Sequence, residues 1–303
     1  MIHTAVRALS TSIVSLGILA VVQAQDESTQ ATQDTDIDRL ISSIQRVEEG
    51  LQGLRLNMST TGSYPGGVTF STRGTLRVLG TTHYHLRVEA SFGGPGGPDE
   101  IRSLTEQVGT SEGLWTRQMG PVEDVYTTMD KDLMERLKIA RRELAKEKES
   151  VVAVLSPLED SAHPLGSAVL GALNQQFSLT VKPGTVRVLD AVECRVIEGD
   201  RRGVAAGADQ TPDVARVEIF LRESDNIPVR IVHWGEQGTN PLLEISITNV
   251  EINPTDLDEA SFVLDVEEGR KVIPVMDHRP SMAQIQRLLS EYAALQRDKK
   301  DGE

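Results

Sequence analysis

The chain has 303 residues, of which 31 are basic and 45 acidic, giving a net charge of −14 at pH 7. This acidic balance argues against nucleic acids and anionic membrane surfaces as partners. Because Cys194 is the only cysteine, the chain has no internal disulfide, and its stability has to come from a buried core. Cys194 lies on the apolar face of a strand-like stretch, which predicts a buried, unreactive thiol.

Residues 1–24 have the order of a secretory signal peptide. His3 and Arg7 give a weakly basic start, an apolar run follows over 13–22, and Ala24 is a small residue at the expected cleavage position. The apolar run is shorter than the about 20 residues that a membrane-spanning helix needs. We therefore expect export to the periplasm with cleavage near Ala24 and no transmembrane anchor afterwards; an uncleaved anchor is the alternative.

A polar, flexible lead-in is expected over 25–35, followed by a helix over 36–54 with Asp36 as its cap. The apolar residues of this segment recur at helical spacing and define one face: Ile37, Leu40, Ile41, Ile44, Val47, Leu51 and Leu54. From Leu56 the spacing changes to every second residue, most clearly over 83–90, which predicts a half-buried strand. A loop rich in glycine and proline follows at 93–98.

The middle of the chain combines two short strands with helices. Strands are expected around 113–117 and 122–126. A charged helix over 130–150, capped by Asp130, and a short apolar helix over 167–173 then form a helical insertion at about 130–173.

The second half predicts a series of strands joined by short turns, which is typical of an antiparallel sheet. These strands cover 177–181, 186–196, 215–221, 227–234, 242–252 and 261–266, with a turn at 182–184 and a polar insert at 201–213. Ser281 can cap a last amphipathic helix over 282–295, which ends in a charged tail. The elements together predict an α+β fold.

The order of these segments resembles the LolA-like superfamily, the fold of periplasmic outer-membrane lipoprotein carriers. The matching segments are the helix 37–54, the strand pair 72–76 and 85–88, the segments 111–115 and 122–126, and the closing run 217–221, 226–231, 247–253 and 257–265. The resemblance implies one domain over 36–278. Its fold would be a large, curved, unclosed antiparallel sheet, a half-barrel, with helices on its concave face and a separate C-terminal helix and tail at 279–303.

The resemblance also implies an apolar ligand, such as lipoprotein acyl chains, held between sheet and helices. Candidate lining residues are Tyr84, Leu86, Trp115 and Phe220, with Arg87 at the rim; the alternative for each is a place in the ordinary core. Arg87 departs from the pattern of the carriers, because it lacks their preceding proline and aromatic partner. The low aromatic content, 4%, also differs from a cavity built to grip acyl chains.

The sequence contains none of the catalytic motifs sought: no Gly-x-Ser-x-Gly, no His-Glu-x-x-His and no Cys-x-x-Cys. His83 and His85 are spaced to point the same way from a strand and could share a metal ion, but no third ligand is evident, and polar positions on the outer side of the sheet are the better interpretation. We therefore expect no enzyme, no cofactor and no metal.

Three functions can be weighed against these expectations. The first is a periplasmic carrier of an apolar ligand in lipoprotein sorting. The second is an envelope sensor or protein-interaction module, in which the C-terminal helix over 282–295 fills the cavity and the partner is an envelope protein. The third, an enzyme, lacks a supporting motif.

Overall fold

The computed structural model describes residues 35–63, 68–93, 101–147, 166–189, 191–202, 214–236 and 238–301. The predicted signal peptide, all but the last residue of the lead-in predicted over 25–35, and most of the predicted loops at 93–98 and 201–213 lie outside the described residues.

Twelve strands of the described chain form one sheet, in the order β12-β6-β5-β4-β3-β2-β1-β11-β10-β9-β8-β7. Eleven of them are β1 (Gly53–Ser63), β2 (Thr69–Leu79), β3 (His83–Gly93), β4 (Ile101–Gly109), β5 (Gly113–Met119), β6 (Asp124–Asp130), β7 (Phe177–Leu189), β8 (Val192–Arg201), β9 (Val214–Arg222), β10 (Pro228–Gly235) and β11 (Pro241–Ile252). These eleven pair antiparallel, while β12 (Val272–Pro274) pairs parallel to β6. The edge strands β12 and β7 do not pair with each other, so the sheet is not closed into a barrel.

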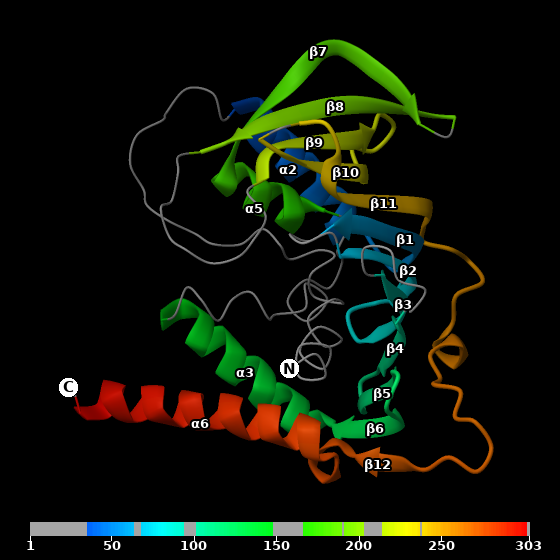
Figure 1. Cartoon of the computed structure of the whole chain (residues 1–303), viewed down its shortest axis with the longest axis vertical. Helices are drawn as coiled ribbons and strands as arrows, with labels where there is room; N and C mark the ends of the chain where they lie inside the picture. Colours follow the sequence, from blue (N-terminus) through cyan, green and yellow to red (C-terminus); the bar gives the residue numbers. More distant parts are fainter. Residues whose placement is uncertain are drawn as a thin grey trace.

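The sheet bends from β7 at the top of Figure 1 to β6 and β12 at the bottom, and the helices lie inside the bend. The long helices are α2 (Thr35–Glu49), α3 (Lys131–Glu147), α5 (Ser167–Gln176) and α6 (Arg279–Asp301). The predicted class, an α+β fold with a large, unclosed, curved sheet and helices on its concave face, is confirmed.

The concave face is apolar because alternate residues of neighbouring strands are in register. Leu56 of β1 faces Leu76 of β2, which in turn faces Leu86 of β3. These leucines belong to one core with Ile44 of α2 and Leu173 of α5. The amphipathic stripe predicted for the first helix is covered by this sheet face, which explains its spacing.

A carboxylate from α2 caps the first turn of α5. Gly166 precedes α5 with φ of 124° and supplies no side-chain cap, and a β-carbon at this position would lie 2.6 Å from Pro228. Glu48 Oε1 accepts hydrogen bonds from the backbone N–H groups of Gly166 (3.1 Å) and Ser167 (3.2 Å), and the Ser167 hydroxyl donates to Oε2. The negative charge also interacts favourably with the positive end of the helix dipole.

Replacing Glu48 with alanine should lower the free energy of unfolding by about 2 kcal/mol, because it removes a charged cap from three donors. Urea denaturation followed by circular dichroism measures this change. Glu49→Ala, at the exposed neighbouring position, is the control and should leave the midpoint nearly unchanged. Equal midpoints for the two variants would contradict the capping role.

The convex face carries a segment without regular strands, residues 253–271, which we call the strap. It runs along the outer side of the sheet from β11 towards β12 (Figure 1). Phe262 and Leu264 of the strap are buried against Val108 of β4 and Tyr126 of β6. The predicted strand over 261–266 is therefore wrong. Its alternation of apolar residues arises from packing onto the sheet, and Asp258 begins a short 3-10 turn (Glu259–Ser261) instead of a ladder.

Arginine side chains tie the strap to β5 and β6. Arg117 donates to both carboxylate oxygens of Asp124 (3.2 and 3.1 Å) and to Glu267 of the strap (2.6 Å). Arg270 of the strap also donates to Asp124 (3.1 Å). The Arg117 guanidinium lies over the Tyr126 ring at 5.0 Å. These hydrogen bonds raise the pKa of Arg117 despite its partial burial.

The remaining helices lie at the β5–β6 end of the sheet. Leu137 of α3 packs with Ile285 of α6 and with Val275 of the short helix η3 (Val275–Asp277). Asp130 Oδ1 accepts a hydrogen bond from Leu133 N–H at 2.8 Å, as its predicted role as a cap requires. In the described part of the chain, no residue of α6 joins the core under α2 and α5.

Several elements differ from those predicted. The first helix ends at Glu49, because the chain turns at Gly50 and then enters β1, where Leu54 pairs with Val78 of β2. Leu54 fits the apolar spacing of the helix because the helix and β1 contribute to the same core. The strand β4 was not predicted.

The predicted turn at 182–184 lies inside β7, where pairing with β8 shifts between Val181 and Val186. Pro183 has no N–H group to pair, which an edge strand tolerates. The last helix begins at Arg279, so Ser281 is inside it; its hydroxyl bonds His278 Nδ1.

Candidate functional site

Two of the five candidate lining residues lie together on the concave face. Leu86 is buried in the main core, and Tyr84 of the same strand packs against that core. The Tyr84 ring lies over Gly109 of β4, where a β-carbon would come within 2.2 Å of it. The Tyr84 ring can occupy this position because Gly109 has no side chain.

The other three candidates lie on the convex face, in separate places. Arg87 is beside Leu86 in the sequence and therefore points the opposite way, where it pairs with Glu89 at 3.0 Å. Trp115 packs against the cluster under the strap. Phe220 lies in a cluster with Cys194 and Val196, and the guanidinium groups of Arg187 and Arg230 each lie 5.7 Å from its ring centroid. The structure therefore does not bring the five residues together.

The concave face changes character between β3 and β4. Leu86 and Val88 are buried, yet their partners across the ladder are Gln107 and Thr105, which are half-buried and polar. An apolar surface thus meets a hydroxyl and an amide at the border of these two strands. Such a border suits an amphiphilic molecule, whose chain and polar group need different neighbours.

A buried histidine lies farther along the concave face. His233 of β10 is 2% exposed, and its ring meets the Phe177 ring edge-on with centroids 6.4 Å apart. Burial lowers the pKa of His233 to about 4, because the charged imidazolium would lose its hydration. The ring is therefore neutral at pH 7. Sequence reasoning missed this residue, since nothing in its neighbourhood distinguishes it from an exposed histidine.

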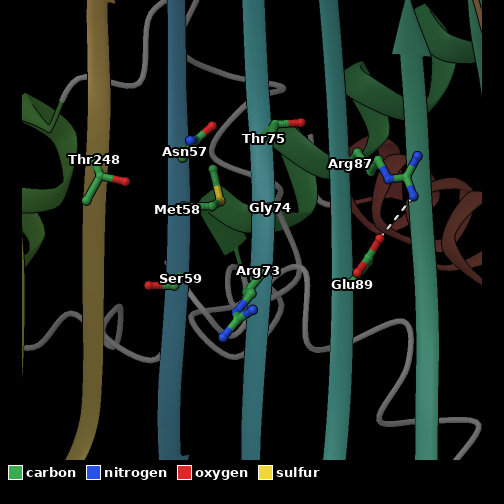
Figure 2. A pocket seen from close by; sticks show the side chains of 9 residues that line it. All are labelled: Asn57, Met58, Ser59, Arg73, Gly74, Thr75, Arg87, Glu89 and Thr248. Carbon is green, nitrogen blue, oxygen red and sulfur yellow. Dashed lines mark hydrogen bonds and ion pairs between the residues drawn. The ribbon is translucent and has the colours of Figure 1, made fainter.

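A polar depression of about 360 Å³ lies on the convex face over the middle strands, and we call it the trough (Figure 2). Its lining consists of Asn57, Met58, Ser59, Arg73, Gly74, Thr75, Arg87, Glu89 and Thr248. Two rows in register cross it: Thr248–Asn57–Thr75–Arg87 and Ser59–Arg73–Glu89. The alternation of polar residues in β1 and β2 was the sequence signal for this face. Of the residues that line the trough, only Arg87 of β3 was predicted to belong to a binding site.

The histidine pair lies on the convex face. His85 Nε2 is 2.8 Å from Glu106 Oε1, and the His83 ring centroid is 5.6 Å from that of Phe262 in the strap. Each imidazole thus has its own neighbour. Among the described residues, no group of three or more His, Cys, Asp and Glu side chains could hold a metal ion.

The free cysteine is buried, as predicted. Cys194 is 0% exposed, and burial raises the pKa of its thiol. A protonated, inaccessible thiol is a poor nucleophile. Among the described helices, none has the length and apolar character needed to cross a membrane.

No protein-family model and no curated protein sequence matches this chain. Solved structures do match. A crystal structure of MucB has 12% sequence identity and a TM-score of 0.40, over 78% of this chain and 65% of that chain. A chain in the Pseudomonas aeruginosa MucA/MucB complex has 10% identity and a TM-score of 0.37, over 76% of this chain and 62% of its own length. This chain thus spans a little under two thirds of those chains.

A LolA superfamily protein from Nitrosomonas europaea also matches, with 10% identity and a TM-score of 0.26, over 76% of this chain and 98% of that chain.

Proposed function

We propose that this protein is an exported, non-catalytic binding protein that holds an apolar ligand, such as the acyl chains of a lipoprotein, against the concave face of its sheet. The observation that carries the proposal is the continuous apolar surface of eight neighbouring strands, from β7 to β3, which ends beside polar side chains of β4. The helices α2 and α5 pack on this surface.

The energetics of such binding require no catalytic residue. Each buried CH₂ of an acyl chain contributes about 0.8 kcal/mol. Burying ten of them would contribute roughly 8 kcal/mol before ordering costs, which corresponds to about micromolar affinity. In this proposal the acyl chain of the ligand contacts Leu86 and Val88, and the polar end of the ligand contacts Thr105 and Gln107.

Native mass spectrometry of protein purified from its own cell envelope tests the proposal, and the expected result is a bound lipid. Displacement of a fluorescent fatty acid then measures affinity. Val88→Thr changes little volume but places a hydroxyl on the apolar surface, and it should weaken binding by about fivefold. Ser91→Ala, on the opposite face of the same strand and outside the trough, is the matched control. Empty protein from the envelope together with no binding of the fatty acid would refute the proposal.

The second candidate function is an interaction module for an envelope protein. It is favoured by the position of α6, whose described apolar contacts are to α3 and η3, so that much of this 23-residue helix faces outward. Crosslinking in intact cells followed by purification should then recover an envelope protein through α6. Recovery of lipid alone would favour the carrier.

A further inference from the structure

We propose that the trough on the convex face is a second binding site, which takes a phosphate group. It lies on the face opposite the apolar core and does not depend on the proposed carrier function. Its nine lining residues come from β11, β1, β2 and β3, four strands in the middle of the sheet (Figure 2). Its volume of about 360 Å³ is within the usual range for small-molecule sites, about 300–1,000 Å³.

The depth of the trough follows from the lengths of its side chains. Short polar residues, Asn57, Ser59 and Thr75, form a floor of hydroxyl and amide groups. Arg73 and Arg87 are much longer and exposed; the Arg73 side chain extends along β2, and the Arg87 side chain extends from β3 towards the neighbouring strand β4 (Figure 2). On the concave side, a β-carbon on Gly74 would lie 3.2 Å from Met58 Cγ, so Met58 packs across this glycine beneath the floor.

The charge of the trough is positive, although the protein as a whole is acidic. Two arginines face one carboxylate: Glu89 pairs with Arg87 at 3.0 Å and is the register partner of Arg73. Within the part of the chain that the structure describes, Arg73 has no ion-pair partner. Arg55, in the next row on the same face, differs, because Glu251 and Asp256 each bind it at 2.8 Å.

Phosphate fits this combination of groups. A guanidinium donates two parallel hydrogen bonds to phosphate oxygens, and hydroxyl and amide donors complete the shell. A phosphate on the floor of the trough would draw hydrogen bonds from Ser59, Thr75 and Asn57, and the exposed side chains of Arg73 and Arg87 would rotate towards it from β2 and β3. The carboxylate of Glu89 would repel the phosphate, which limits the affinity. Because the binding is electrostatic, it should weaken as the salt concentration rises.

Isothermal titration calorimetry with pyrophosphate, and flotation with vesicles of phosphatidylglycerol or of phosphatidylcholine, test the proposal and distinguish its two sources of phosphate. Binding of pyrophosphate alone identifies a soluble phosphorylated ligand. Binding of phosphatidylglycerol vesicles, without phosphatidylcholine vesicles, identifies a lipid headgroup. Binding of neither probe at millimolar concentration overturns the proposal.

Variants locate the binding. Arg73→Ala and Arg87→Ala should each weaken it by about tenfold or more, whereas Glu89→Gln should strengthen it by about threefold. Arg39→Ala, on the exposed side of α2, is the matched control and should have no effect. Unchanged affinity in the Arg73→Ala/Arg87→Ala double variant would refute the site. Val88→Thr should leave phosphate binding intact, so failure of this site and failure of the carrier proposal give different results.

Discussion

Replacing Arg117 with methionine should lower the free energy of unfolding by about 3 kcal/mol, because the change leaves a largely buried carboxylate without its main partner. The side chains of Arg117 and Asp124 are 14% and 16% exposed, and two hydrogen bonds join them. The same arginine holds Glu267 of the strap and covers the Tyr126 ring. Its loss should therefore loosen the strap before the sheet unfolds.

Two readouts separate these effects. Urea denaturation gives the global change, and the fluorescence of Trp115 in a Trp234→Phe background reports on the strap that covers it. Arg270→Met is the control. Arg270 also bonds Asp124, but its side chain is 47% exposed, so the cost should stay below about 1 kcal/mol. Equal losses in the free energy of unfolding for the two variants would show that burial does not strengthen the contribution of the Arg117–Asp124 pair to stability.

Acidification should destabilise the protein through His233. The pKa of His233 is about 4 in the folded protein, below the value of 6.5 for an exposed histidine. Its contribution to stability is therefore fully present above about pH 6.5 and is lost as the pH falls towards 4, where the unfolded chain binds a proton that the folded protein does not. The loss amounts to about 3 kcal/mol over this range.

The difference between wild type and His233→Leu isolates this contribution from that of the carboxylates. Urea midpoints measured from about pH 7.5 to about pH 4 should converge or cross, with the leucine variant less sensitive to acid. Ile231→Val, on the same face of β10, is the control and should lower stability by about 1 kcal/mol at every pH. Parallel curves for wild type and His233→Leu would contradict the prediction.

The alternation of residues in β3 correctly predicted that Leu86 and Val88 point to a core, because a strand of period two allows no other way to bury them. The same alternation should have separated Arg87 from that site, since neighbouring residues of a strand point to opposite faces. Trp115 and Phe220 were proposed as lining residues of the ligand site between sheet and helices, but both lie on the convex face. A large aromatic residue indicates burial but not the face on which it is buried.

The sequence by itself determined the elements: an amphipathic helix, a series of alternating strands with short turns, a charged helix behind Asp130 and a C-terminal helix. These follow from local spacing and turn residues, which act over a few positions. Only the tertiary structure decided what covers each face of the sheet, because the cover comes from distant segments. Arg117 and Glu267 are 150 residues apart, and they join the sheet to the strap, whose apolar residues form a second core on the convex face at β4–β6. The strap contacts β1 and β3 at Arg55 and His83. Beside these contacts, the short and long polar side chains of β1, β2 and β3 form the trough.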